Sequence, residues 1–118
     1  MTRINYDDKR FASVENSETG EVSGETVFHY RQSGDLVRAE YAGGRIVFGQ
    51  LIAKVLENDC LEMRYQHLNR RGELMTGRCF STPEVLPDGR IRLYEKWQWT
   101  SGDRSAGESV IEEIPADR

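Results

Sequence analysis

The chain has 118 residues, of which 31% are charged, and its formal net charge is −4. This length predicts one domain, 1–118, that buries roughly two thirds of the surface of its unfolded chain. No run of about 18 apolar residues occurs, which excludes a membrane-spanning helix. The basic residues are scattered among acidic ones, which argues against nucleic-acid binding because phosphate recognition needs clustered Lys and Arg.

The N-terminus and the cysteines predict the compartment. The first residues, MTRINYDDKRF, lack the apolar core of a signal peptide, so we expect a cytoplasmic protein. Cys60 and Cys79 have no partner at zinc-ligand spacing. If 61–69 pairs with 73–82, Cys79 faces Met63 and lies roughly 10 Å from Cys60 along the strand direction. A disulfide spans at most about 7 Å between Cα atoms, so both cysteines are expected to be reduced.

Apolar and polar residues alternate along the chain, and no segment longer than a turn or two has helical spacing. Gly49 predicts a bulge or bend, and 83–89 is predicted as a connection that ends in a Pro-Asp-Gly turn. The first strand is short and weak. The predicted strands are Arg10–Val14, Thr26–Gln32, Leu36–Tyr41, Arg45–Leu56, Leu61–Asn69, Glu73–Thr82, Arg90–Thr100 and Glu108–Ile114.

The connections between these strands predict the topology. Each is of hairpin length, which predicts an antiparallel meander. Eight twisted strands in a meander tend to close, because closure removes exposed sheet edges. We therefore predict an all-β fold, an eight-stranded antiparallel up-and-down barrel whose last strand pairs with its first. An open, half-rolled sheet is the alternative, because the first strand is weak.

One strand carries both tryptophans and a carboxylate on the same face. Along 90–100 the odd positions are Ile91, Leu93, Glu95, Trp97 and Trp99. A buried carboxylate must pair with a cation, accept several hydrogen bonds or take up a proton. Three roles are therefore open for Glu95. It belongs to an internal ion pair or hydrogen-bond cluster that fixes the packing of the barrel, it orients a ligand, or it acts as a general acid or base. The cations expected within its reach are Arg38, Arg64 and Arg78.

Aromatic residues and one histidine predict a pocket beside Glu95. His67 shares its strand face with Tyr65 and is expected to point inward, whereas His29 lies opposite Phe28 and Tyr30. A structural histidine is the alternative for both, and neither has the further ligands of a metal site. No catalytic residue, metal or cofactor is nominated. The aromatic residues expected inside are Phe28, Tyr41, Phe48, Tyr65, Trp97 and Trp99, and the candidate ligand-binding residues are Tyr65, His67, Glu95, Trp97 and Trp99.

Three functions are compatible with such a barrel. The first is binding of a small apolar or aromatic molecule at one mouth, with Glu95 as the polar contact. The second is an enzyme similar to cyclases and isomerases, in which Glu95 handles a proton. The third is a structural or assembly role, in which filled barrels pack into homodimers or homotetramers. The faces expected to be exposed for such packing carry Val47, Leu51 and Leu68.

Several motifs carry a resemblance that covers nearly the whole chain. They are ETVFHYRQ, YAGG, LIA, MRYQH, GELMTG, STPEVLPDGRIRL and EKWQWTSGD, within Glu25–Gln32, Tyr41–Ala53, Met63–Gly77 and Ser81–Gly102. By these motifs the chain resembles a family of small bacterial proteins, often labelled N-acetylglutamate synthase. The resemblance implies an avidin-like, calycin-type barrel similar to streptavidin, and it brings no catalytic residues.

The acyltransferase label can be compared with the residues. Acetyl-CoA-binding acyltransferases of the common fold use a (Gln/Arg)-x-x-Gly-x-(Gly/Ala) loop at a helix N-terminus, where backbone amides bind the pyrophosphate. The nearest matches, Arg31–Leu36 and Arg104–Ser109, lack the final Gly or Ala, and both lead into predicted strands. The sequence therefore argues against this chemistry.

Overall fold

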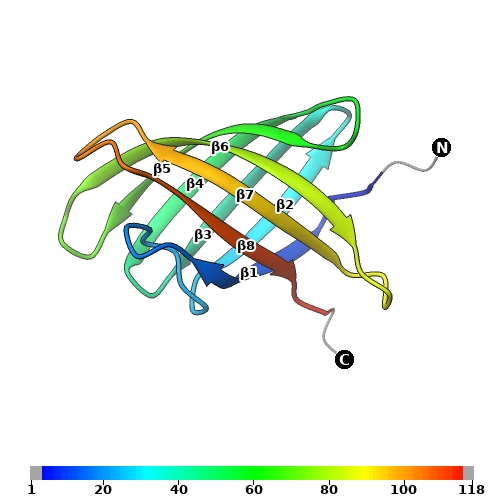
Figure 1. Ribbon diagram of the computed structural model, residues 1–118, viewed down its shortest axis with the longest axis horizontal. Coiled ribbons are helices and arrows are strands. Elements are labelled where there is room, and N and C mark those ends of the chain that lie inside the picture. The colour runs from blue at the N-terminus through cyan, green and yellow to red at the C-terminus, as the bar shows by residue number, and fades with distance from the viewer. Residues whose placement is uncertain (1–3, 116–118) are drawn as a thin grey trace.

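A computed structural model describes residues 4–115, which form a closed barrel of eight strands (Figure 1). Each strand pairs antiparallel with the next, and β8 pairs with β1. The predicted all-β, up-and-down barrel is therefore confirmed, and the open sheet is wrong. The strands are β1 Lys9–Asn16, β2 Val27–Ser33, β3 Leu36–Gly43, β4 Ile46–Val55, β5 Leu61–Asn69, β6 Leu74–Val85, β7 Ile91–Trp99 and β8 Ala106–Glu113.

The weak first strand closes the barrel. It is longer than predicted, because β1 includes residues on both sides of Arg10–Val14. Its pairing with β8 runs from Phe11 opposite Glu113 to Asn16 opposite Ser109, with a bulge between Ser13 and Glu15. This bulge breaks the alternation of inward and outward side chains, which explains why the strand was weak in the sequence.

Strand β6 continues through a proline that was predicted to begin a connection. Pro83 lies opposite Leu93 in β7, and pairing with β7 continues to Val85. On the other side, the pairing with β5 ends where Ser81 faces Leu61. Beyond Ser81 the strand has a neighbour on one side only. Proline is tolerated at such an edge because its missing N–H removes no hydrogen bond from the ladder.

A bulge in β4 corrects three predictions. The register shifts between Ile46 and Phe48, so both Val47 and Phe48 point outward and Gly49 points inward. Phe48 is 46% exposed, so its predicted interior position is wrong. Leu51 follows Gly49 on the inner face and is buried, so its predicted exposure is also wrong. The bulge lies beside Gly49 rather than at it. A shift of one residue exchanges the two faces of a strand.

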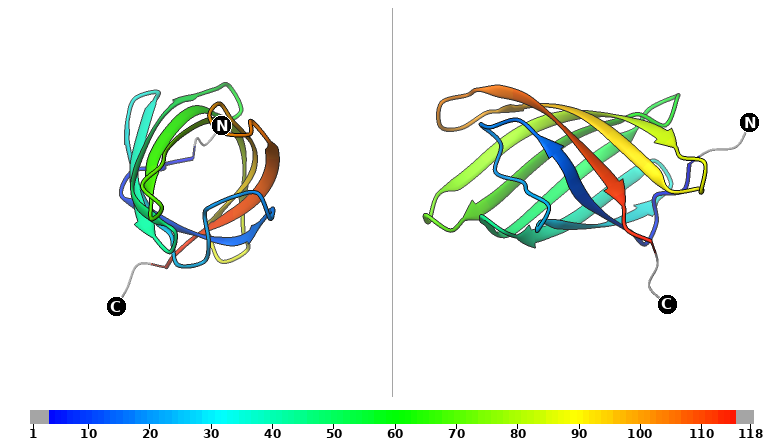
Figure 2. Two further views of the ribbon diagram at one scale, coloured as in Figure 1. Left: turned by 90° about the vertical axis from the view of Figure 1, so that its left-hand side faces the viewer. Right: turned by 60° about the horizontal axis from the view of Figure 1, so that its bottom comes forward.

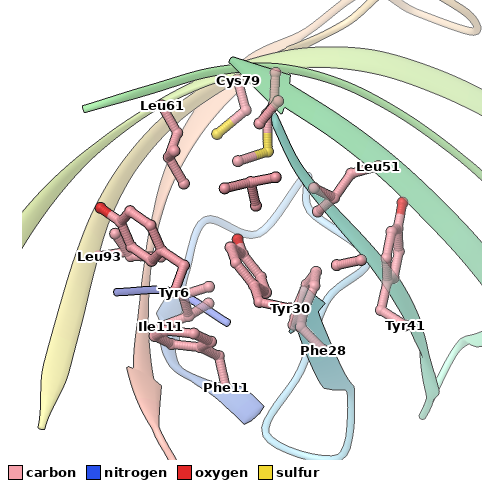
Figure 3. Packing of buried hydrophobic residues seen from close by; sticks show 14 of the residues in the cluster. Tyr6, Phe11, Phe28, Tyr30, Tyr41, Leu51, Leu61, Cys79, Leu93 and Ile111 are labelled. Atoms are coloured by element: carbon pink, nitrogen blue, oxygen red, sulfur yellow. The ribbon is translucent and has the colours of Figure 1, made fainter. Parts of the chain in front are cut away.

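Side chains fill the half of the barrel nearest Tyr6. Tyr30 lies centrally among rings, with ring centroids 4.7 Å from Phe11 and 6.3 Å from Tyr6 (Figure 3). Tyr6 precedes β1 and closes this end, since its hydroxyl donates to the carbonyl oxygen of Asp59 at 2.6 Å. The fully buried side chains here include Tyr6, Phe11, Tyr30, Val37, Leu61, Leu93 and Ile111.

Candidate functional site: a cavity at one mouth of the barrel

A cavity of about 50 Å³ remains at the end of the barrel opposite Tyr6, space for roughly four water molecules. Inward positions near the mouth ends of several strands line it, together with part of the β1–β2 connection. The five candidate ligand-binding residues predicted from the sequence all line this one cavity: Tyr65, His67, Glu95, Trp97 and Trp99.

Three glycines make room for aromatic rings in the cavity wall. In each of three alternate hairpins, β3–β4, β5–β6 and β7–β8, an inward aromatic residue lies directly opposite a glycine on the next strand. A Cβ atom on any of these glycines would lie 2.2–2.5 Å from the partner ring, closer than atoms can approach. The rings therefore lie against the sheet and leave the centre open. The pairs are Tyr41 with Gly49, Tyr65 with Gly77, and Trp97 with Gly107.

The aromatic rings of the cavity contact one another. The centroid of Trp99 lies 5.7 Å from that of Trp97 and 5.8 Å from that of Tyr65. The ring planes meet at 57° and 68°, so they form adjoining walls rather than a stack. On the opposite side, Phe28 stacks on Tyr41 at 4.7 Å. The cavity therefore presents several ring faces to a bound molecule.

His67 lies at the mouth between a carboxylate and a phenol. Its Nε2 is 2.8 Å from Oε1 of Glu21, and its Nδ1 is 3.0 Å from the Tyr41 hydroxyl. A carboxylate can only accept, so Nε2 carries the proton and Nδ1 accepts from Tyr41. Burial lowers the pKa of His67, and the hydrogen bond to Glu21 offsets only part of this effect. The imidazole is therefore neutral at pH 7.

Glu21 belongs to the connection between β1 and β2, residues 17–26, which lies at the mouth (Figure 2). The side-chain amide of Asn69 donates to Oε2 of Glu21 at 3.1 Å. Trp99 Nε1 donates to the carbonyl oxygen of Thr19 at 3.2 Å. Side chains of β5 and β7 thus hold this connection across the cavity. The sequence predicts no role for Glu21, because its hydrogen-bond partners are more than 40 residues away.

Glu95 lies deep in the cavity and is 9% exposed. The hydroxyls of Ser81 and Ser109 donate to its two carboxylate oxygens, each at 3.0 Å. Burial raises the pKa of Glu95 to about 7, against the effect of the Ser109 and Ser81 hydrogen bonds. Near neutral pH this carboxyl group therefore exchanges between the protonated and the ionised form.

The predicted arginine partners of Glu95 are wrong. Arg38, Arg64 and Arg78 all point outward and are exposed. They occupy alternate positions to the inward Ala39, Met63 and Cys79, so the period of two places them outside the barrel. Two serines, at Ser81 and Ser109, take the place of the expected cations. Short hydroxyl side chains fit beside Glu95, because they are its direct cross-strand neighbours.

The other histidine and the cysteines agree with the sequence analysis. His29 points outward, where its Nε2 is 2.8 Å from Asp8 Oδ1. Cys79 faces Met63 as predicted, and both cysteines are free and buried. Among residues 4–115, no three His, Cys, Asp or Glu side chains gather into a possible metal site. The same part of the chain contains no helix able to cross a membrane.

A family model described as Avidin-like protein matches residues 4–114. The chain belongs to the avidin-like family. None of the curated proteins compared with the sequence matches it. The family match and the closed barrel together confirm the avidin-like fold that the resemblance implied. The N-acetylglutamate synthase label stays a prediction made from resemblance. Both glycine segments considered for it, Arg31–Leu36 and Arg104–Ser109, lead into strands of this avidin-like barrel.

The avidin-like barrel is thus divided into a packed half and a half with a cavity. The packed half contains residues missed in the sequence, above all Tyr6, which precedes the first strand. The alternation of β2 placed Phe28 and Tyr30 on one inward face, and both are buried. The sequence did not indicate how far along the barrel axis each inward residue lies. Phe28 lines the cavity, whereas Tyr30 of the same strand lies in the packed half.

Proposed function

We propose that this avidin-like protein binds a small apolar or aromatic molecule in the mouth cavity. The observation that carries the proposal is the convergence of Tyr65, His67 and Glu95 with both tryptophans on one open space in an otherwise packed barrel. Binding cavities are concave and mostly apolar, with a few polar groups that fix orientation. Here the aromatic rings form the apolar part, and Glu95 and Ser109 provide polar contacts.

The two tryptophans make the proposal directly testable. The chain has only two, and both line the cavity, so tryptophan emission reports on the site. A metabolite library that includes neutral, cationic and anionic molecules would be screened by thermal shift and by tryptophan emission. We expect a ligand to raise the melting temperature and to change the emission together. A library in which no molecule moves either signal contradicts the proposal.

A variant and a control locate the binding. Trp99→Phe removes part of the cavity wall and should weaken the binding of a ligand found in the screen. Tyr94→Phe is the matched control, because Tyr94 is exposed on the outer face of the same strand. Equal affinity of both variants would place the ligand outside the cavity.

The second candidate is an enzyme similar to cyclases and isomerases, and the position of Glu95 favours it. Burial raises the pKa of Glu95 to about 7, which suits proton transfer near neutral pH. If the barrel is an enzyme, Glu95→Gln should abolish turnover of a bound substrate while the melting temperature is retained. Unchanged turnover in Glu95→Gln excludes this role for Glu95.

A further inference from the structure

The charges around the cavity do not balance. Its charged lining residues are Glu21 and Glu95, and within residues 4–115 no Lys or Arg lines it. Arg71 offsets Glu21 from outside, with 3.6 Å between its Nη2 and the Glu21 Oε2. Glu95 has only the hydroxyls of Ser81 and Ser109 as hydrogen-bond partners in the described part of the chain. An ionised carboxylate buried without a cation is costly, and a bound cation would remove that cost.

The titratable groups that face Glu95 are neutral. They are Tyr30 on β2, Tyr41 on β3, Tyr65 on β5 and Cys79 on β6. Burial raises the pKa of each of these groups, so all of them keep their protons at physiological pH. His67 at the mouth is neutral as well. No described neighbour therefore compensates the charge of Glu95 from inside the barrel.

Acceptor positions are left open on two residues that line the cavity. Asn16 Oδ1 is buried and has no hydrogen-bond partner among residues 4–115, and Asn16 lines the cavity. Each Glu95 oxygen accepts one hydroxyl, which leaves further acceptor capacity on both atoms. The site can therefore accept hydrogen bonds from a ligand.

The apolar part of the wall suits the same kind of ligand. Aromatic faces attract cations that lie within about 6 Å of the ring centroid. Trp97, Trp99 and Tyr65 provide three such rings whose neighbouring centroids are 5.7 and 5.8 Å apart. Rings on several sides together with one carboxylate are an arrangement that recognises organic ammonium groups.

We propose that the ligand of the mouth cavity is a small organic ammonium ion, which the aromatic rings surround and Glu95 neutralises. This inference rests on the proposed binding function and specifies the class of ligand. The enclosed volume of about 50 Å³ is roughly a third of the ~150 Å³ cavity that accommodates benzene, so only the ammonium head of the ion enters the cavity and an attached ring lies at its mouth.

A series of three probes of nearly equal shape separates charge from shape. Benzylamine is a cation at pH 7.5, benzyl alcohol is neutral and benzoate is an anion. Binding of each to the wild-type protein would be measured by tryptophan fluorescence and calorimetry. We expect benzylamine to bind at least tenfold more tightly than benzyl alcohol, and benzoate not to bind.

The outcomes distinguish this inference from the proposed function. If benzyl alcohol or benzoate binds as tightly as benzylamine, the ammonium inference is wrong and the binding function stands. If none of the three probes binds, the ammonium inference is also wrong, whereas the binding function is decided by the wider library. These arms need only the wild-type protein, so they do not depend on whether a variant folds.

A charge variant tests the role of Glu95. Glu95→Gln keeps the size of the side chain and removes its charge. The affinity for benzylamine should fall roughly 30-fold, as expected for removing one partner of a buried charge pair. Glu40→Gln is the matched control, because Glu40 is exposed on the outer face of β3, and it should bind as the wild type does. Equal affinity of Glu95→Gln and the wild type for benzylamine overturns the inference.

The permanent cation tetramethylammonium separates the titration of the protein from that of the ligand. Its charge does not change with pH, so a pH dependence must come from groups of the barrel. Because Glu95 ionises as the pH rises through about 7, the affinity should increase between pH 6.5 and 8.5 and should not change in Glu95→Gln. A flat profile in the wild type contradicts the proposed pairing.

Discussion

At the scale of single residues, Glu95 makes the stability of the protein depend on pH. Burial raises the pKa of this group in the folded state from the ordinary value of 4.5 to about 7. The folded state therefore holds the proton more tightly than the unfolded chain does. The resulting stability is fully present below about pH 4.5 and is lost as the pH rises through about 7.

Glu95→Gln should remove this dependence. The free energy of unfolding of the variant, relative to the wild type, should increase by about 3 kcal/mol between pH 4.5 and pH 8, since one pKa unit corresponds to about 1.4 kcal/mol. Urea unfolding at several pH values measures the difference. A difference that stays constant with pH would show that Glu95 titrates as it does in the unfolded chain. His67 contributes equally to the pH dependence of unfolding in both proteins, so its contribution cancels in the difference.

The glycines opposite aromatic rings give a second prediction at this scale. In Gly77→Ala the new Cβ would lie 2.2 Å from Tyr65, so the ring must move into the cavity. We expect a loss of about 1–3 kcal/mol of stability, typical of overpacking, together with weaker ligand binding and altered tryptophan emission. Gly24→Ala is the control, because its Cβ would meet only ordinary contacts at 3.6 Å. Equal melting temperatures for both variants would contradict this account.

At the scale of elements, the β1–β2 connection depends on one buried side chain. Glu21 is bonded to His67 and Asn69, and these contacts join the connection to β5. The other hydrogen bonds between the connection and the barrel lie mainly at its two ends, at Ser17 and Thr26. Between these ends, Trp99 donates to Thr19 and Asn16 donates to Val22. Local opening of such a segment is expected at a lower free energy than global unfolding.

Glu21→Ala should therefore loosen residues 17–26 and leave the strands intact. Losing the buried hydrogen bonds costs about 1–3 kcal/mol, which corresponds to roughly 10- to 100-fold faster amide exchange in this segment. Hydrogen–deuterium exchange with mass spectrometry measures it. Glu18→Ala is the control within the same connection, because Glu18 is exposed. Faster exchange throughout the barrel would instead identify Glu21 as part of the global core.

At the scale of the whole molecule, exposed apolar residues on the outer surface allow the assembly hypothesis to be tested. Phe48, Leu68 and Leu74 lie directly opposite one another across β4, β5 and β6, and they form an exposed apolar row. Leu74 is the most exposed of the three, at 78%. Contiguous apolar surface of this kind is common at contacts between subunits.

If barrels associate through this row, light scattering should give a mass that is a multiple of 13.6 kDa. Leu74→Lys should then shift the protein towards the monomer, because burying a charge at the contact is costly. Leu36→Lys, at an exposed position outside the row, should leave the mass unchanged. A strict monomer at high concentration removes the assembly hypothesis.

The sequence by itself determined the topology and the inward face of most strands. Alternation has a period of two and hairpin connections are local, so strand order and the inward positions of the five candidate site residues followed from neighbouring residues. Closure joins β1 to β8, and the sequence left an open sheet as the alternative. Where the period was broken, prediction failed. The bulge beside Gly49 exchanged the faces of Phe48 and Leu51.

Only the tertiary structure decided what surrounds Glu95. The sequence left open whether the barrel is filled or open, and the structure shows one packed half and one cavity. Ser81 and Ser109 bind Glu95 where arginines were expected, and Glu21 binds His67 where no partner was predicted. Contacts between such distant segments depend on the register of the strands and on the depth of each residue in the barrel. Periodicity specifies which side chains point inward. It does not specify which of them meet.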